Sequence, residues 1–569
     1  MGRQEKQRVG YSQFACIGSG FSAVGLGATL KRWYGITDIH FFERHSDLGG
    51  TWFANTYPDA PGCACDVPSL LYSFSFAPNP RWTRVLASSG ELLEYLKHVA
   101  DDYDLPSKMT FGAEVKRCEW LQHSQRWRIH FRNVDDDTMS VHECQFLFAG
   151  TGALVTPRDP DVPGLESFNG PVIHAGRWSS DVELRGKNVV LVGNGCSAAQ
   201  IVPNIVNETK QLTQFVRSKH WIIPHMNVPT STTLQWAFEH VPGLLATARF
   251  LLFLSAENDL RGFYMTKAGA SFRARREAGA ARYVRKTAPA KYHHLLIPDY
   301  EIGCKRRIFD PGYLKALHAT NLNVTDDPIT QVLPDAVRSK SGATTKADII
   351  VLATGYSTNS FMAGIEVVGR NGVTMDQHWE SFDGPEAYNG CALNEFPNFF
   401  MLLGPNTVTG HTSAIMAIEN AINYALRVIK PVIDGDATTA EVKREAEIQY
   451  SQQMQEDLHK TVWWGGCANW YNTKGRSGKQ WNAMTYPHSQ MHYWYKCLFP
   501  TYGDWNYTRT PNAARRIFLR RTKKLVLWTG LLLVAARISL FVRSKGLEFN
   551  NYLPHVLQAC QAIQQRLPF

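Results

Sequence analysis

The stretch Gln13–Ala23, QFACIGSGFSA, decides the fold of the first half of the chain. Its apolar residues Phe14–Ile17 predict a buried strand, which runs directly into a turn at Gly18-Ser-Gly20 and then into a helical pattern. A strand, a Gly-rich turn and a helix in this order begin a βαβ unit that binds a dinucleotide. Gly18 permits the tight turn, Gly20 lets a pyrophosphate approach the backbone, and Ala23 allows close packing of helix on strand.

An acidic residue follows this turn at the spacing that a dinucleotide site needs. The next apolar strand, Ile39–Phe42, ends in Glu43, 25 residues after Gly18. A carboxylate there accepts hydrogen bonds from a ribose 2′-hydroxyl. An ordinary turn is the alternative, but strand, helix and Glu43 in register favour a cofactor site, which we assign to FAD.

The same unit recurs later in the chain. Strand Val189–Val192 precedes a second turn, formed by Gly193, Gly195, Cys196, Ser197 and Ala198. The strand after it, Leu212–Val216, ends in Arg217, Ser218 and Lys219 instead of an acid. An Arg at this place can pair with the 2′-phosphate of NADP, whereas it offers nothing special to NAD. The second site is therefore expected to prefer NADP, and a solvated basic loop is the alternative reading.

Two such units predict an α/β fold with two Rossmann-like domains, the NADP-binding domain inserted in the FAD-binding domain. The Pro-rich stretch 156–164 separates the units, and the apolar run ADIIVLA at 347–353 is expected to end the second one. We expect FAD-binding parts at 1–155 and 348–510, and an NADP-binding domain at 156–347 with a helical insert at about 225–297. A basic, apolar, helical tail is expected at 511–569. FAD first and NADP second is an arrangement for hydride transfer from NADPH to flavin.

Further predictions concern helices and cysteines. Helices are expected at Ser413–Ile429, stopped by Pro431, and at Thr438–Leu458. The eleven cysteines are scattered and show no spacing typical of zinc, so we expect reduced thiols and no metal site. No CxxC lies beside the first unit, which disfavours a thiol reductase.

The basic charge of the chain is concentrated in its tail. Residues 501–569 carry a net charge of +9, and the remainder carries +1, which argues against a nucleic-acid-binding face on the fold. The apolar segment 525–542 lies between basic flanks and is near the lower limit for a membrane span, with Arg537 inside it. A bilayer span or an interfacial helix is favoured, and a docking helix is the alternative. The N-terminus has no apolar signal segment, so we expect an intracellular, membrane-associated protein that is not secreted.

One motif between the two units is more specific than the units themselves. Phe168–Trp178, FNGPVIHAGRW, matches FxGxxxHxxxW, and the chain thereby resembles Baeyer–Villiger monooxygenases, most closely the fungal enzymes of secondary metabolism. Further family patterns occur in GGTWFANTYP at 49–58, CDVPS at 65–69, YSF at 72–74, GAL at 152–154 and ATGY at 353–356. Two departures are Ser179 after the Trp and a longer loop between Pro58 and Asp66.

The resemblance implies an NADPH- and O2-dependent flavoprotein monooxygenase that inserts one oxygen next to a ketone carbonyl. It implies that Arg306, in GCKRR at 303–307, stabilises the anion formed during oxygen transfer, that Asp66 holds Arg306, and that Lys305 contacts the 2′-phosphate. Arg307, the next residue, is the alternative candidate for the anion-stabilising role. His174 and Trp178 are implied as hinge residues and Trp470 as part of a loop that covers NADP. Further cofactor contacts are implied for Ser22, Gly50, Thr51, Trp52, Tyr72 and Val115.

Two other functions remain open at this point. One is oxygenation of nitrogen or sulfur, against which Trp178 and the Lys305–Arg306 pair argue. The other is a membrane-associated flavoprotein that oxidises NADPH without oxygenating a substrate. The substrate is expected to be a small-molecule ketone such as a polyketide or terpenoid, and the sequence leaves the oligomeric state open.

Overall fold

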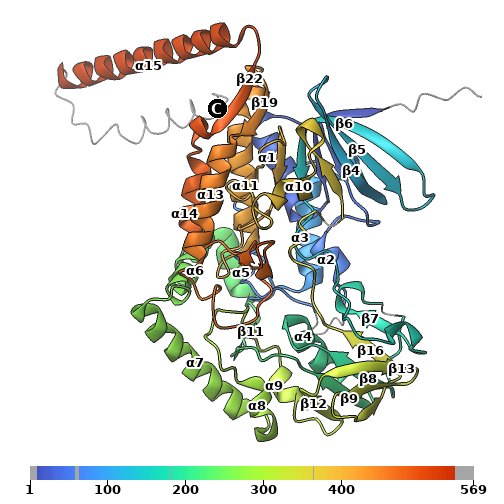
Figure 1. Ribbon diagram of the computed structural model, residues 1–569. Helices are drawn as coiled ribbons and strands as arrows, with labels where there is room; N and C mark the ends of the chain where they lie inside the picture. Colours follow the sequence, from blue (N-terminus) through green and yellow to red (C-terminus); the bar gives the residue numbers. More distant parts are fainter. Residues whose placement is uncertain (1–8, 58–62, 180, 363, 545–569) are drawn as a thin grey trace, which may run out of the picture.

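The structure is a computed structural model that describes residues 9–57, 63–179, 181–362 and 364–544. Figure 1 shows an α/β body with one sheet at each end and a long helix that projects from the body. The stretch 58–62, where the loop before Asp66 is longer than in the family, and the tail after Ser544 lie outside the described residues.

The first sheet contains the first Gly-rich turn and has the strand order β17-β4-β5-β6-β1-β2-β3, with β18 paired to β6. Strand β1 pairs in parallel with β2 and β6, while β4, β5 and β6 form an antiparallel meander. The strands are β1 Gly10–Ile17, β2 Ile39–Phe42, β3 Met109–Thr110, β4 Ala113–Leu121, β5 Arg126–Asn133, β6 Met139–Ala149, β17 Glu366–Val368 and β18 Phe399–Met401. Residues Phe14–Cys16 are fully buried, as a continuous apolar run in a central parallel strand requires.

Helices from distant parts of the chain complete this first domain. Helix α1 packs on α11, and α11 packs on α14. The helices are α1 Phe21–Tyr34, α2 Thr51–Ala54, α3 Ser89–Asp102, α10 Met375–Glu380, α11 Ala414–Val428, α12 Lys430–Ile433, α13 Arg444–Leu458 and α14 Gln490–Leu498. The first domain is therefore discontinuous, as the sequence predicts.

The second sheet is wholly parallel, in the order β12-β9-β8-β16-β7, with helix α4 following its Gly-rich turn. Its elements are β7 Val172–His174, β8 Asn188–Val192, α4 Cys196–Ile205, β9 Gln211–Phe215, α9 Tyr313–Ala316, β12 Leu322–Thr325 and β16 Ile349–Leu352. Strand β16 lies between β8 and β7, so the second sheet extends beyond the expected boundary at residue 347. A small antiparallel sheet lies beside it, formed by β13 Ile329–Leu333, β14 Ala336–Ser339 and β15 Thr344–Lys346.

A helical insert leaves and re-enters the second domain at one place, because β10 Ile222–Ile223 pairs with β11 Ile308–Phe309. The insert contains α5 Thr232–His240, α6 Leu244–Glu257, α7 Lys267–Thr287 and α8 His293–Leu296.

Of the two helices expected in the later chain, one is confirmed and one begins later than expected. The segment expected as one helix over 438–458 begins as strand β19, Ala437–Val442, which pairs with β22, Trp505–Arg509, and only then becomes α13. Its β-branched residues Thr438, Thr439 and Val442 fit the strand better than a helix. The helix expected at Ser413–Ile429 is confirmed as α11, which ends at Val428 before Pro431, and Pro431 then lies at the start of the short helix α12, where the missing N–H costs nothing.

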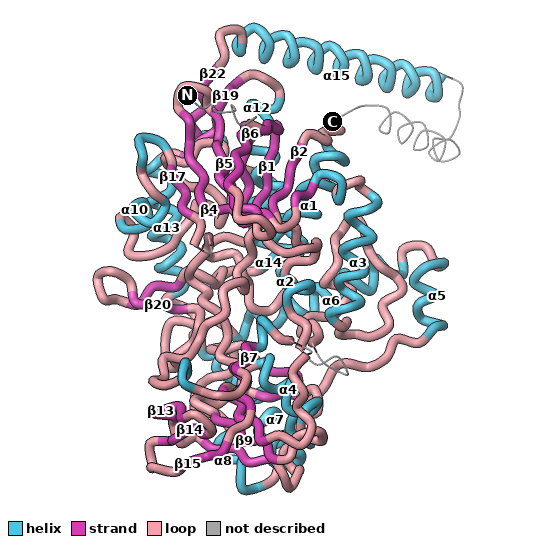
Figure 2. Tube along the Cα trace, turned by 90° about the vertical axis from the view of Figure 1, so that its right-hand side faces the viewer, coloured by secondary structure: helices cyan, strands magenta, loops and turns pink. Residues whose placement is uncertain are grey.

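The two domains are joined by paired crossovers, and Figure 2 shows the two sheets one above the other with these connections between them. The Arg158 amide donates to the Gly355 carbonyl over 2.9 Å, and the Ser357 amide donates to the Thr156 carbonyl over 2.9 Å. The chain thus leaves and re-enters the first domain through two adjacent segments that are hydrogen-bonded to each other.

The last described element, α15, Ala513–Ser544, projects from the body. Its base is fixed because Arg520 forms ion pairs with Asp434 and Asp436, and Arg516 donates to the Gly435 carbonyl. Residues 513–541 form the one helix among the described residues that is long and apolar enough by itself to cross a membrane, and none of its apolar window is buried.

Candidate active site

The first Gly-rich turn forms a backbone cradle with an acid at its rim. Gly18 has φ +105°, and a Cβ there would lie 2.6 Å from the Gly150 carbonyl oxygen, so a side chain is excluded. Gly20 precedes the first residue of α1 and faces Gly50. Glu43 accepts from the Ser19 amide over 3.0 Å and from its hydroxyl over 2.8 Å, which places the carboxylate beside the turn. This cradle fits the pyrophosphate and ribose of FAD.

The second turn has the same construction with basic residues in place of the acid. Gly193 has φ +121°, and a Cβ there would lie 2.3 Å from the Ala353 carbonyl oxygen. A Cβ on Gly195 would meet nothing within 4 Å, so the space above the start of α4, where Cys196, Ser197 and Ala198 begin the helix, is open. The Asn194 side chain donates to the Ser218 carbonyl over 2.6 Å and so holds the loop that carries Arg217 against this turn.

Lys305 and Arg217 approach each other beside the second turn. Burial and the nearby Arg217 guanidinium lower the pKa of Lys305. The Lys305 ammonium lies 5.0 Å from the centre of the Tyr300 ring, and the Tyr300 hydroxyl donates to the Lys219 carbonyl. Two like charges held together fit a dianionic group such as the 2′-phosphate of NADP.

Asp66 and Arg306 form a two-point ion pair between the two cradles. The Arg306 Nε and Nη2 atoms donate to the Asp66 carboxylate over 2.5 and 2.7 Å. Burial of Asp66 acts to raise its pKa, but the Arg306 guanidinium outweighs this and holds it below the usual value. The charge of the same pair raises the pKa of Arg306 against the opposing effect of burial. Arg306 is thus fixed in orientation and remains protonated.

The second cradle reaches this ion pair. The pKa of the Cys196 thiol, at the start of α4, is raised to about 12 by burial and by the Asp66 charge. The Gln200 side chain of α4 donates to the Ala64 carbonyl and accepts from the Tyr57 hydroxyl. The second dinucleotide cradle therefore packs against the segment that carries Asp66.

Arg307, the rival position, has a separate partner. Its guanidinium pairs with Asp259 over 2.6 Å, and Arg276 pairs with the same carboxylate. A cavity of ≈ 270 Å³ lies between Asp66, Arg306 and the helical insert. Its apolar lining includes Leu71, Ile223, Leu252, Phe263, Phe272 and Trp463. The geometry thus holds Arg306 against Asp66 and Arg307 against the insert.

His174 lies at the junction of the two domains, at the end of β7. Its Nδ1 accepts from the Gly176 amide over 3.0 Å, and burial lowers its pKa. The ring lies edge-on to Tyr356, whose hydroxyl donates to Asn55 of the FAD domain over 2.6 Å. Trp178 is half-buried and packs against the main core. These contacts fit residues that couple the position of one domain to the other.

The segment around Trp470 is linked to the segment of Arg306 by a disulfide. Cys304 and Cys467 are bonded, which corrects the expectation that all the cysteines are reduced thiols. The Trp470 carbonyl accepts from the Thr358 hydroxyl over 3.0 Å, and the side chain is half-exposed. Trp470 lines a second, larger cavity of ≈ 830 Å³ together with Arg158 and Tyr356. The loop that carries Trp470 is therefore tied to the second crossover at Thr358 and to the Lys305–Arg306 segment.

Tyr471 is a site residue that the sequence did not reveal. Burial raises its pKa to about 12, and Arg306, Cys196 and Asp66 are among the groups that act on it. It lines the same cavity as Arg306. Tyr471 lies near Arg306 only because of the fold of a loop that is far away from Arg306 in the chain. In the sequence, the one indication that Tyr471 belongs to the site was its position next to Trp470.

The other implied cofactor residues gather around the first cradle. Thr51 and Trp52 begin α2 after Gly50, and the Trp52 indole donates to the Tyr72 hydroxyl over 3.3 Å. Ser22 and Ala23 are buried in the first turn of α1. Val115 is buried in β4, whose first residue, Ala113, donates its amide to the Glu43 carbonyl over 2.8 Å.

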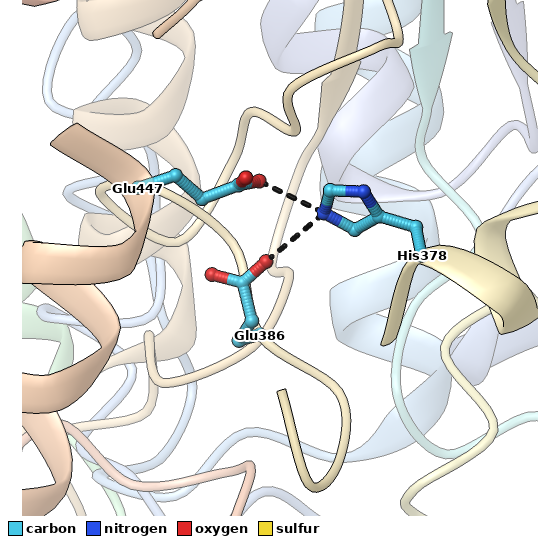
Figure 3. A group of neighbouring side chains, drawn as sticks. All are labelled: His378, Glu386 and Glu447. Atoms are coloured by element: carbon cyan, nitrogen blue, oxygen red, sulfur yellow. Dashed lines mark hydrogen bonds and ion pairs between the residues drawn. The ribbon is translucent and has the colours of Figure 1, made fainter. Parts of the chain in front are cut away.

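A third polar group is buried beneath α10, and Figure 3 shows how its side chains converge. The His378 Nε2 atom lies 3.0 Å from Glu447 and 3.4 Å from Glu386. These carboxylates raise the pKa of His378 to about 9 although burial opposes the charge. Glu447 also accepts from the Asn394 amide and from Arg444, so the group fits a buried ion-pair network.

Comparison with known proteins agrees with this geometry. The flavin-binding monooxygenase-like family profile matches residues 12–240. A Baeyer–Villiger monooxygenase of Streptomyces coelicolor is 36% identical over 477 residues, covering 83% of this chain and 89% of that protein. One of Pseudomonas aeruginosa is 34% identical over 480 residues, covering 84% and 88%. An FAD-binding monooxygenase of Aspergillus terreus is 29% identical over 491 residues, covering 84% and 86%.

Solved structures share the fold. Cyclohexanone monooxygenase from Rhodococcus sp. Phi1, bound to NADP+, superposes with a TM-score of 0.76 at 23% identity, covering 88% of this chain and 100% of that one. At this identity the likeness establishes the architecture of two dinucleotide-binding domains, and the chemistry is argued from this chain's own residues.

Proposed function

This chain belongs to the flavin-binding monooxygenase-like family, and from that premise we propose that it is an NADPH- and O2-dependent Baeyer–Villiger monooxygenase with its oxygen-transfer site at Arg306. The observation that carries the proposal is the two-point ion pair between Arg306 and Asp66, placed between two dinucleotide cradles and at the wall of an apolar cavity.

Bound FAD, reduced by NADPH, supplies the activation of dioxygen. Arg306 supplies a permanent positive charge for the negative charge that develops on the ketone oxygen when the carbonyl carbon is attacked. Its pKa is raised by Asp66, so it does not lose its proton to that anion. Asp66 fixes the guanidinium plane, so the charge is in place before the reaction begins.

The second cradle supports NADPH as the reductant. The open backbone at Gly195 would receive the pyrophosphate at the start of α4, and Lys305 with Arg217 would receive the 2′-phosphate. His174 and Trp178, at the domain junction, would set the position of this domain relative to the flavin. Trp470 would cover the bound nucleotide from the loop tied to Thr358.

The cavity supports an apolar ketone as substrate. About half of its lining residues are aliphatic or aromatic, and its charged groups form two sets, one at Arg306 and Asp66 and one at Arg307, Asp259 and Arg276. We propose a polyketide or terpenoid ketone of secondary metabolism, because its hydrocarbon part would contact the apolar lining while a carbonyl lies beside Arg306.

Helix α15 supports attachment to a membrane. Its apolar residues 525–541 are exposed, and its basic residues Arg515, Arg521 and Lys523 precede them. Basic residues beside an apolar helix favour an anionic lipid surface, to which they are attracted.

The test is NADPH consumption with a panel of cyclic and linear ketones, with the product identified by mass. The proposal predicts ester or lactone, formed one to one with the NADPH consumed. Hydrogen peroxide without an oxygenated product would contradict it, and N-oxide or sulfoxide from amine or sulfide substrates alone would favour oxygenation of nitrogen or sulfur instead.

A further inference from the structure

Helix α6 presents two different surfaces. Leu252, Ser255 and Ala256 line the cavity beside Arg306. On the other side Phe250, Leu251 and Leu254 are 54%, 59% and 43% exposed. On average the two sets point to different sides of the helix, and Leu251 and Ser255, four residues apart, are neighbours where the two sides meet. One helix thus separates the oxygen-transfer cavity from the surroundings and exposes large apolar side chains to them.

Helix α6 is held to the body at its middle and at its C-terminal end. In its middle Arg249 donates to the Leu70 carbonyl and to the Ser73 carbonyl. At its end Glu257 accepts from His411 over 2.8 Å and from the amides of Gln490 and Met491. The exposed apolar residues of α6 therefore belong to a rigid surface and not to a loose loop.

Helix α14 also exposes apolar side chains. It begins beside Glu257 and exposes Met491, Trp494 and Tyr495, and Phe499, directly after its end, is exposed as well. We call these four residues, together with Phe250, Leu251 and Leu254, the α6–α14 face. Several exposed large apolar side chains on two helices that meet at Glu257 fit a site of interaction. Its Trp and Tyr are the residues that gather where a protein meets the polar boundary of a bilayer.

Helix α15 leaves the molecule on the same side. In Figure 1, α6 and α14 lie on the left of the body and α15 projects to the left. In Figure 2, α6 and α15 lie toward the right, so the two views agree for these two helices, whereas α14 lies near the middle of the body. The fixed base of α15 carries exposed Arg515 and Arg521, and its apolar residues follow farther from the body.

We propose that the α6–α14 face rests on an anionic lipid bilayer into which α15 inserts, and that the cavity beside Arg306 takes its ketone from that bilayer. The proposal rests on the proposed attachment through α15 and on the proposed oxygenation, and it adds a second contact and a route for the substrate. The bilayer is favoured over a second copy of the chain because an apolar helix with a basic base emerges beside the face. A membrane-dissolved ketone would reach the α6 wall of the cavity without crossing water.

The first experiment measures binding of the full chain to phosphatidylcholine vesicles that contain phosphatidylserine, by flotation. The face variant is Leu251→Ser, Leu254→Ser, Trp494→Ser and Phe499→Ser. The control is Val134→Ser with Met139→Ser, also exposed apolar positions but on the β5–β6 side of the body, away from α15. We expect the face variant to partition at least about tenfold more weakly, since four apolar side chains lose their lipid contact, and the control to bind like the wild type.

The second experiment separates the entry of the ketone into the cavity from its oxygenation. Oxygenation of a short, water-soluble methyl ketone is compared with that of a long-chain methyl ketone dissolved in the same vesicles. We expect the face variant to keep its kcat/KM for the soluble ketone and to lose at least about fivefold for the vesicle-dissolved one.

Each part of the proposal has its own contradicting result. Equal flotation of the face variant and the wild type would overturn the face, and equal use of vesicle-dissolved ketone would overturn the substrate route. Wild-type protein that does not float would overturn membrane attachment, while turnover of the soluble ketone would leave the oxygenation proposal intact. A concentration-dependent dimer in vesicle-free solution, lost in the face variant, would show that a second copy covers the face and would overturn the bilayer.

Discussion

Asp66 and Arg306 lie 240 residues apart in the chain and share two hydrogen bonds. The family resemblance identified both residues because each occurs in a short motif with a fixed pattern. Tyr471 was missed because only the folded loop brings it to Arg306. The choice between Arg306 and Arg307 also needed coordinates, since adjacent residues are equivalent in sequence but here pair with different acids.

Asp66→Asn is expected to destabilise the protein and disable the site together. The change leaves a half-buried guanidinium without its counter-charge, which costs about 3 kcal/mol. The measurement is the free energy of unfolding alongside ester yield per NADPH. A variant with unchanged stability and full product yield would show that Asp66 does not hold Arg306.

The pH dependence of stability is expected to carry the signature of His378. Its pKa is raised to about 9 in the folded protein, against an ordinary value of 6.5. Its contribution, about 3 kcal/mol, is therefore fully present below pH 6.5 and is lost as the pH rises through about 9. In denaturant titrations from pH 6 to 10, His378→Gln should lower the stability at the acid end and flatten this decline. Parallel curves for wild type and variant would contradict the assignment.

Some helices and strands could be predicted from their local sequence, whereas others depend on partners far away in the chain. Strand β1 and helix α1 could be predicted because a buried parallel strand, a Gly-rich turn and a helix each leave a local pattern. Strand β19 could not, since residues 437–442 become a strand only through pairing with β22, which lies more than sixty residues later. The disulfide between Cys304 and Cys467 was equally invisible, because its two segments are far apart in sequence.

The basic pair beside α4 is expected to set the preference for NADPH. Lys305→Ala should raise the KM for NADPH about tenfold or more, because a charge-assisted contact to the 2′-phosphate is lost. The KM for NADH should stay the same, since NADH has no such phosphate. Arg217→Ala should behave alike, and Lys210→Ala, an exposed lysine just before β9, is the control. An equal rise for both nucleotides would indicate a structural effect and not phosphate recognition.

The covering loop is expected to loosen when its disulfide is removed. Cys467→Ser frees the loop from the Lys305–Arg306 segment, so cleavage between residues 468 and 480 in limited proteolysis should become several times faster. Reductant should produce the same change in the wild type and no further change in the variant. Unchanged cleavage in both cases would show that the bond does not restrain the loop.

The overall architecture could be predicted because the sequence contains the same strand–turn–helix unit twice. The α/β architecture with one dinucleotide domain inserted in the other followed from the two Gly-rich turns and is shared by the solved relatives. The shared side of α6 and α15 did not follow, because it depends on how segments from distant regions of the chain pack together. The tail could be recognised as apolar and basic, but not the rigid apolar face beside its base.

One measurement tests the central claim most directly: rapid mixing of Arg306→Ala with NADPH and a ketone, following flavin reduction and product in the same sample, with Arg307→Ala as the matched control. We expect Arg306→Ala to be reduced at a rate close to that of the wild type but to form at least about a hundredfold less ester, its electrons appearing as hydrogen peroxide. Arg307→Ala should retain product formation. Normal ester formation by Arg306→Ala would contradict the account.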